Sequence, residues 1–326
     1  MPSVPASLPL LKPPRLVPGM TIGVAAPASP PDEPETFRFG LEVIESLGFT
    51  AKPAPHLFDR SGYLAGGDAA RAQDINDLFG DESVDAIFCL RGGYGASRLL
   101  PLLDYERIRL NPKIILGYSD ITSLLLGIYA KTGLVTFHGP MATRGYSAYS
   151  LSELKKVLFD PQAPVLLAAP PPFERAEGRV EKENRITRIS PGKGRGRLLG
   201  GNLSLVSHLV GTPYMPDLAG AILFLEDVDE PVYSIDRLLT HLWLSGAMEK
   251  LAGVVFGKFT NVKVSEYRQD RTLEDVLSER LRALGIPSAA GLMIGHIDDQ
   301  ATIPLGCEAE FDAEAATLTL LEPAVC

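Results

Sequence analysis

Hydrophobic and polar positions alternate in blocks over the first half of the chain. Between residues 20 and 160, continuous apolar runs such as 84–90 and 113–116 are separated by segments with apolar residues at helical spacing, such as 35–48 and 66–81. Apolar strands that alternate with helices are typical of a parallel sheet covered on both faces. The pattern therefore predicts an α/β fold with an N-terminal, doubly wound parallel-sheet domain over residues 20–160.

The pattern changes in the remaining segments. Proline, glycine and charged residues dominate 161–190, which predicts a linker with one or two exposed strands. Strand and helix patterns are mixed over 191–326, and strand patterns prevail towards the end, so we expect a second, strand-rich α+β domain there. Residues 1–19 are rich in proline and are expected to form an N-terminal extension.

Composition narrows the class of protein. The chain has 326 residues, 45% of them hydrophobic, which suffices for one large core or two ordinary ones. The net charge is -9 and no basic stripe is visible, so we expect no nucleic-acid partner. Neither a signal peptide nor an apolar run of about 20 residues is present, which predicts a cytoplasmic protein without membrane contact. The three cysteines form no C-x-x-C pair, so neither a disulfide framework nor structural zinc is expected.

Ser119 stands at a corner between an apolar strand and a helix pattern, in the run Gly-Tyr-Ser-Asp. One interpretation is a helix cap, since serine is a favoured N-cap residue, and taken alone this is the commoner case. The other is a nucleophile on a strand–turn–helix elbow, where the first helix amides can stabilise an oxyanion. The run lacks the second glycine of G-x-S-x-G, so it does not match an α/β-hydrolase.

The glycine-rich run Arg91–Gly95 follows the neighbouring apolar strand. It can be a tight turn, or a cradle in which backbone amides bind an anion, although it lacks the sequence of a P-loop. In a third interpretation the amide of Gly92 or Gly93 joins that of Asp120 as the second donor of an oxyanion hole. Arg91 is a weaker candidate for binding a substrate carboxylate.

Three of the five histidines, His138, His208 and His241, lie within strand or helix patterns and are expected to be structural. His296 instead follows the apolar run Gly-Leu-Met-Ile-Gly and precedes a polar segment, which places it at a strand end. This position suits a general base, while a surface histidine in a turn is the alternative.

Glu226 directly follows five apolar residues. A carboxylate buried at a strand end is costly unless it is paired, and a histidine base needs such an orienting carboxylate. Because Asp227, Asp229 and Glu230 follow, a site for a hard cation is a rival interpretation, although the spacing of a calcium loop is missing.

Three groups of segments, RGGYG…GYSDIT…HGPM, GGNLSLVSHLVGTPY…FLEDVDE and GHIDDQATIPLG, resemble the LD-carboxypeptidase (muramoyltetrapeptide carboxypeptidase) family from about residue 20 to the end. The resemblance implies a triad of Ser119 as nucleophile, Glu226 as orienting acid and His296 as base. It also implies that the amides of Asp120 and Gly93 bind the oxyanion. No cofactor and no metal are implied, and a homodimer is expected.

For function, the resemblance implies a serine carboxypeptidase that acts on a small muropeptide in peptidoglycan recycling. The bond cleaved would join the L-centre of diaminopimelate or lysine to the terminal D-alanine of a murein tetrapeptide. A relative with the same triad could instead cleave peptide-nucleotide antibiotics of the microcin C type, which an adenine-stacking aromatic near the site would favour. Trp243 is expected to pack within its helix, and this favours murein. A non-catalytic two-domain binding protein is the third alternative.

Overall fold

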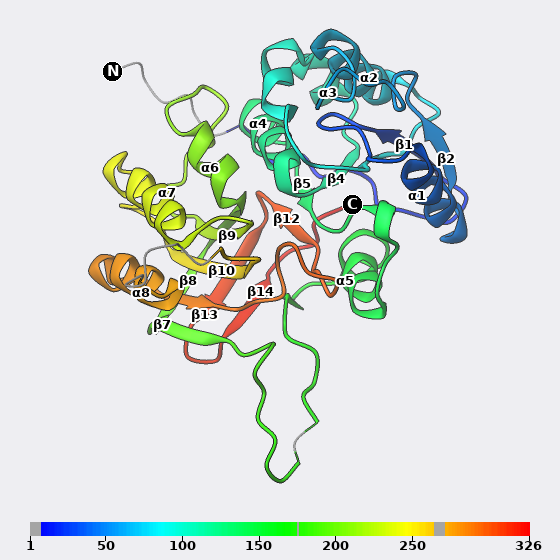
Figure 1. Ribbon diagram of the computed structural model, residues 1–326. Coiled ribbons are helices and arrows are strands. Elements are labelled where there is room, and N and C mark those ends of the chain that lie inside the picture. The colour runs from blue at the N-terminus through cyan, green and yellow to red at the C-terminus, as the bar shows by residue number, and fades with distance from the viewer. Residues whose placement is uncertain (1–7, 175, 264–270) are drawn as a thin grey trace.

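The computed structural model describes residues 8–174, 176–263 and 271–326, and these form two sheets with helices around them (Figure 1). The fold is of the α/β class, with a parallel sheet in the first half and a strand-rich sheet in the second, as the hydrophobic pattern predicts. None of the helices over the described residues is long and apolar enough to cross a membrane.

The first sheet has six strands in the order β12-β5-β4-β3-β1-β2. Its first five strands along the chain are mutually parallel, and β12 joins β5 in antiparallel orientation. The strands span β1 Thr21–Ala25, β2 Thr50–Pro53, β3 Ala86–Cys89, β4 Ile114–Gly117, β5 Thr136–His138 and β12 Ile303–Leu305. Every residue of β3, β4 and β5 is buried, which agrees with the continuous apolar runs in the sequence.

Helices cover this sheet on both faces (Figure 1). Helix α3 contacts both α2 and α4, while α1 packs on β2 and on η3. The helical spacing at 35–48 and 66–81 is confirmed to within two residues at each end. The elements are α1 Pro34–Ser46, α2 Asp68–Gly80, α3 Tyr105–Leu110, α4 Thr122–Thr132 and α5 Ala148–Leu158, with the short turns η1 Ala96–Leu102, η2 Ser119–Ile121 and η3 Ala142–Arg144.

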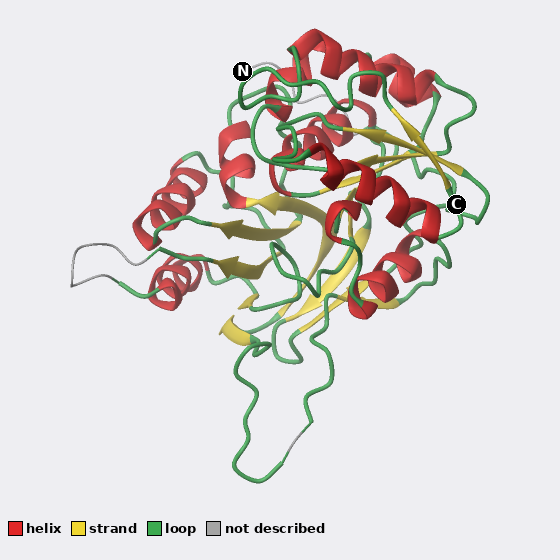
Figure 2. Ribbon diagram, turned by 45° about the vertical axis from the view of Figure 1, so that its right-hand side comes forward, coloured by secondary structure: helices red, strands yellow, loops and turns green. Residues whose placement is uncertain are grey.

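The second sheet has eight strands in the order β6-β14-β13-β8-β9-β10-β11-β7, of which β8 to β11 are parallel. Figure 2 shows helices alongside this sheet as well as around the first one. The strands span β6 Val165–Leu167, β7 Thr187–Ser190, β8 Lys193–Asn202, β9 Ile222–Val228, β10 Gly253–Thr260, β11 Ser288–Ala290, β13 Glu308–Asp312 and β14 Thr317–Leu320. The helices are α6 Leu203–Leu209, α7 Val232–Leu244 and α8 Leu273–Leu284.

The chain crosses between the halves more than once. The expected linker 161–190 contains β6 and β7, which pair with β14 and β11 of the second sheet, and the long loop between them extends away from the body (Figures 1 and 2). In return, β12 comes from 191–326 and completes the first sheet. The limits of two separate domains therefore stay a prediction.

The described part of the expected N-terminal extension is paired with the body of the protein. The amide of Leu11 donates to the Gly133 carbonyl at 2.9 Å, and the Leu11 carbonyl accepts from Val135 at 2.8 Å. The C-terminal residue also contacts this segment, because the amide of Cys326 donates to the Pro13 carbonyl at 3.0 Å. This segment thus pairs with the chain just before β5 and is part of the folded body.

The two halves touch where β8 ends and α4 begins. The amide of Asn202 donates to the Thr122 hydroxyl at 3.1 Å, and a Cβ on Gly201 would lie 2.6 Å from the same side chain. Only glycine permits so close an approach, and Gly201 also has a φ of +139°. The carboxyl ends of strands from both sheets are brought together at this contact.

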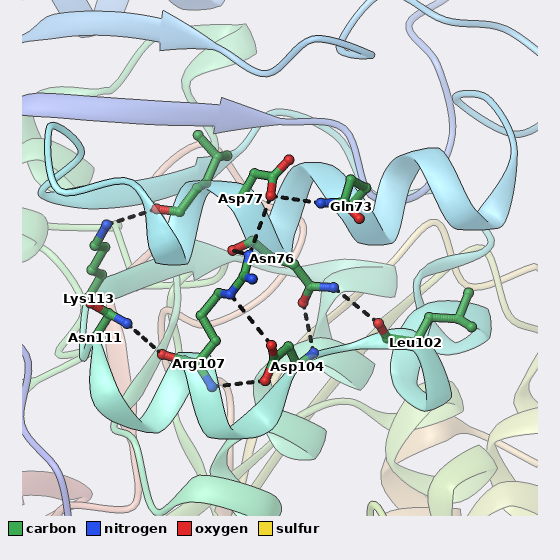
Figure 3. Close-up of polar contacts among 9 residues, drawn as sticks. Gln73, Asn76, Asp77, Leu102, Asp104, Arg107, Asn111 and Lys113 are labelled. Atoms are coloured by element: carbon green, nitrogen blue, oxygen red, sulfur yellow. Dashed lines mark hydrogen bonds and ion pairs between the residues drawn. The ribbon is translucent and has the colours of Figure 1, made fainter.

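A polar network fixes α2 relative to α3 and η1 (Figure 3). Asn76 on α2 donates to the Leu102 carbonyl at 3.1 Å and accepts from the amide of Asp104 at 2.8 Å. Lys113, just before β4, donates to the Leu78 carbonyl at 2.8 Å. These bonds satisfy backbone groups at the end of η1, at the start of α3 and in the last turn of α2, so the position of α2 is set by directional contacts as well as by packing.

Arg71 extends this support to the loops at the carboxyl edge of the sheet. Its side chain is 1% exposed and donates to the Pro27 carbonyl after β1 and, at 3.0 Å, to the Gly95 carbonyl after β3. Asp68 pairs with the guanidinium at 2.5 Å. One buried cation therefore joins the loops that follow β1 and β3, and the second of these lies next to the Ser119 corner.

We expect Arg71→Leu to lower the free energy of unfolding by about 3 kcal/mol, because it leaves two buried carbonyls without their donor and removes one of the two arginines that bind Asp68. The matched control is Arg38→Leu on α1, whose side chain is 68% exposed and whose removal should change stability by less than about 0.5 kcal/mol. Urea unfolding of both variants measures the difference, and equal effects would contradict the role given to Arg71.

Candidate active site

Ser119 is the first residue of the turn η2, directly after β4 and Tyr118. Its φ is +63°, a left-handed conformation that is costly for a residue with a side chain. The capping interpretation is wrong: Tyr118 and Ile121 occupy the cap positions of η2 and α4, and neither cap uses a side-chain bond. The strain belongs to the elbow itself, which holds a half-buried serine at the carboxyl edge of the sheet.

The glycine run lies directly against this corner. A Cβ on Gly92 would lie 2.7 Å from the Cβ of Ser119, 2.9 Å from its hydroxyl and 3.3 Å from the amide nitrogen of Asp120. A Cβ on Gly93, which has a φ of +104°, would instead lie 2.4 Å from the Ser29 hydroxyl. The loops that follow β1, β3 and β4 therefore meet here. Gly92 is the glycine whose Cα faces Ser119.

Asp120 fixes the glycine loop through its side chain. The carboxylate accepts from the amide of Ala96 at 2.7 Å. Burial raises the pKa of Asp120 to about 6, against the opposing effects of the Ala96 amide and of Arg71. The Asp120 side chain therefore holds the glycine loop. Only the backbone amide of Asp120 remains as a candidate oxyanion donor beside Ser119.

Glu226 and His296 form a direct pair. The Nδ1 of His296 lies 2.7 Å from Oε2 of Glu226, and the Glu226 side chain is fully buried while that of His296 is 18% exposed. Glu226 is the fifth of the seven residues of β9, so the strand continues to Val228 and does not end at Glu226 as predicted. His296 lies in the loop between β11 and β12, and the apolar run before it is not a strand, so its predicted place at a strand end is wrong. With Nδ1 committed to the carboxylate, Nε2 is the ring nitrogen left to accept a proton.

Gly295 makes this pair possible. It has a φ of +121°, and a Cβ there would lie 2.9 Å from both Oε2 of Glu226 and the Lys258 carbonyl. No side chain fits at this position without displacing the carboxylate. The glycine before His296 is the signal in the sequence that marks this close approach.

Tyr118 brings the corner and the pair together. Its ring centroid lies 4.8 Å from that of His296 in an edge-to-face contact. On its other side lies His138, 6.1 Å away, which in turn packs on Phe224 of β9 at 5.4 Å. Ser119 therefore lies one residue from a ring in contact with His296, while no hydrogen bond joins Ser119 to His296 among the described residues.

His138 is structural, as expected. It is fully buried, and neither ring nitrogen has a hydrogen-bond partner among the residues that the structure describes. Burial, with a smaller contribution from His296, lowers the pKa of His138 to about 3. This imidazole stays neutral, so His296 is the candidate base.

The acidic side chains at the end of β9 do not converge on one point. Asp227 accepts from the Asn202 side chain at 2.8 Å and from the Ser204 amide at 3.0 Å, and burial raises its pKa. Glu226 faces His296 instead. Over the described ranges, no group of three or more potential metal ligands is found.

Two further sequence expectations have an outcome. Arg91 forms an ion pair at 3.3 Å with the exposed carboxylate of Asp32 and remains partly exposed itself. Its binding of a substrate carboxylate stays a prediction. The expectation that Trp243 packs within its helix is wrong: it is 48% exposed on α7, and the Arg280 guanidinium lies 5.7 Å from its ring centroid. Arg280 belongs to α8, so Trp243 packs against a neighbouring helix. This contact does not distinguish a murein substrate from a nucleotide substrate.

The order of these parts along the chain matches one family. Models of the LD-carboxypeptidase N-terminal domain and of the LD-carboxypeptidase C-terminal domain match residues 22–139 and 195–311. The chain belongs to the LD-carboxypeptidase family. Membership in this family of serine peptidases makes the protein a hydrolase, and the resemblance seen in the sequence is confirmed.

Relatives of this LD-carboxypeptidase carry two kinds of name. The probable murein peptide carboxypeptidase of Bacillus subtilis is 37% identical over 95% of this chain and 94% of its own length. The structure of the microcin C7 self-immunity protein MccF in complex with aspartyl sulfamoyl adenosine has a TM-score of 0.87 at 30% identity, and covers 97% of this chain and 100% of its own. The muramoyltetrapeptide carboxypeptidase of Oxalobacter formigenes has a TM-score of 0.77 at 30% identity, with 92% and 98% covered.

The neutral state of His138 predicts a pH dependence of stability. Its pKa is lowered on folding, so the unfolded chain binds more protons between pH 6.5 and about 3, and stability from this group falls as pH drops through that range. Between pH 7 and pH 5 the loss is about 2 kcal/mol. His138→Leu should therefore lose less stability than the wild type over this interval in urea unfolding. Equal losses for the two proteins would show that His138 is not held neutral.

Proposed function

We propose that this protein is a serine LD-carboxypeptidase that removes the terminal D-alanine from murein tetrapeptides. The bond cleaved joins the L-centre of diaminopimelate or lysine to D-alanine. The observation that carries the proposal is the buried Glu226–His296 pair, held by Tyr118 beside the strained corner of Ser119. The murein names among the relatives support the choice of substrate.

In this mechanism, His296 accepts the Ser119 proton at Nε2 while Glu226 stabilises the imidazolium through Nδ1. The serine oxygen attacks the scissile carbonyl carbon, and the oxyanion is bound by the amides of Asp120 and Gly93, with Gly92 packed against the reacting oxygen. The imidazolium then returns its proton to the amine of D-alanine, which leaves. Water, deprotonated by His296, hydrolyses the acyl-enzyme and frees Ser119.

The absence of a Ser119–His296 hydrogen bond is compatible with this role. Catalytic hydrogen bonds are often long in unliganded enzymes and shorten when substrate binds. Because the main chain of Ser119 is fixed by the elbow, the hydrogen bond to His296 would form by rotation about χ1 of Ser119 or by a shift of the histidine loop.

Cytoplasmic residence and dimer formation stay predictions.

A second candidate function is hydrolysis of a peptide-nucleotide of the microcin C type. It is favoured by the likeness to MccF, whose structure was solved with an aminoacyl sulfamoyl nucleoside. The chemistry at Ser119 would be the same, and only the group bound beyond the scissile bond would differ. Assaying a tetrapeptide and an aminoacyl sulfamoyl adenosine side by side separates the two substrates.

Ser119→Ala should reduce D-alanine release from a tetrapeptide by at least about 10³-fold, because the nucleophile is lost while the fold remains. Mass spectrometry of the shortened peptide measures turnover, and thermal unfolding checks the fold. Near-normal turnover by the purified variant would contradict the assignment of Ser119.

Gly295→Ala should lower kcat by about 10- to 100-fold, since the new methyl group displaces Glu226 from His296. Gly285→Ala is the matched control, because Gly285 also has a positive φ of +64° but has open space around it. The control also places a side chain at a positive φ, but without the collision, and should stay within about threefold of the wild type. Equal losses in both variants would mean that strain alone explains the effect.

A further inference from the structure

The candidate base is carried on a loop without regular structure. His296 lies between Met293 and Ala301, whose main chains meet because the Ala301 amide donates to the Met293 carbonyl at 2.8 Å. Inside the loop, the Ile297 amide donates to the Gly295 carbonyl at 2.9 Å. These bonds close the loop on itself, and its placement relative to Ser119 needs contacts from outside.

The first turn of α5 supplies such contacts on the side after His296. Ser150 is 1% exposed, and its hydroxyl donates to the Asp298 carbonyl and accepts from the Gln300 amide, each at 2.8 Å. One buried hydroxyl thus satisfies two backbone groups of the loop, as a neighbouring strand would. Ser147, which caps α5, also donates to the Asp299 carboxylate at 2.7 Å.

Helix α5 holds the other end of the loop through a short intermediate segment. The Met293 amide donates to the Ala168 carbonyl at 3.0 Å, and the Ala168 amide donates to the Glu153 carboxylate of α5 at 3.2 Å. Tyr149 donates to the neighbouring Ala169 carbonyl at 2.7 Å. Both ends of the histidine loop are therefore tied to the same helix.

Three of the residues involved, Ser147, Ser150 and Glu153, recur every third position, so they share one face of the helix. The Asp299 carboxylate lies at the N-terminal end of α5, where the helix dipole favours negative charge. Helix α5 follows β5 of the sheet that carries the Ser119 corner, whereas the loop belongs to the second half.

The geometry points to Ser150, assisted by Ser147, as the positioning residue that sets His296 at the distance from Ser119 that proton transfer requires. This inference rests on the proposed function and adds to it a part of the molecule that does not touch substrate. Removing the Ser150 hydroxyl leaves two loop backbone groups without partners. A shift of about 1 Å in a catalytic group can cost about 100-fold in rate.

The experiment compares Ser150→Ala and Ser147→Ala with Ser147→Thr, which keeps the hydroxyl, and with Ser207→Ala. Ser207 is a matched control, since it is 3% exposed and its hydroxyl bonds to His241 at 2.8 Å on another face of the protein. For Ser150→Ala we expect kcat to fall about 10- to 100-fold with KM changed less than about threefold. Ser147→Thr should recover most of what Ser147→Ala loses, and Ser207→Ala should stay within about threefold of the wild type.

A second readout does not depend on turnover. In the wild type, the proton on Nδ1 of His296 that is shared with Glu226 should give a low-field NMR signal, and Ser150→Ala should shift or broaden it. If wild-type protein releases no D-alanine, the proposed function fails, and this signal still tests the positioning. An unchanged signal in folded Ser150→Ala overturns the inference, as does a loss of kcat that disappears once rates are corrected for the folded fraction. If Ser150→Ala does not fold, the same tests apply to Ser147→Ala.

Discussion

The contact between the end of β8 and the start of α4 is the constraint on which the site depends. Asn202 donates to the Thr122 hydroxyl, and Gly201 allows the two main chains to approach. Asn202 is also the direct neighbour of Glu226 in the parallel ladder of β8 and β9, while Thr122 lies three residues after Ser119. This contact, together with the Tyr118–His296 contact and the pairing of β12 with β5, therefore holds the candidate nucleophile near the carboxylate that orients the base.

The energetics of the site follow from this placement. A buried carboxylate is tolerated at Glu226 because it is paired with His296, and the same burial strengthens the pair. Ser119 holds a left-handed conformation that its surroundings enforce: Gly92 packs on one side, and the Asp120 carboxylate is bound to the loop of Ala96. Strain and a buried charge are both features that folded proteins concentrate at functional sites.

Much of this arrangement could be predicted from the sequence. Buried parallel strands leave continuous apolar runs, so Ser119 could be placed just after its strand and Glu226 near the end of its strand. The strand β12 in the first sheet and the hold of Ser150 on the histidine loop could not be predicted, because contacts over about 150 residues of separation leave no periodic signal. The role of Gly92 as the glycine facing Ser119 depends on backbone torsions that the run Arg-Gly-Gly-Tyr-Gly does not specify.

The central claim is that His296 activates Ser119 for attack, and a serine-directed phosphonofluoridate tests it most directly. The account predicts one adduct, found by mass spectrometry on the peptide that contains Ser119, formed at least about 100-fold more slowly in folded His296→Gln. Labelling elsewhere, or equal labelling rates with and without His296, would contradict it.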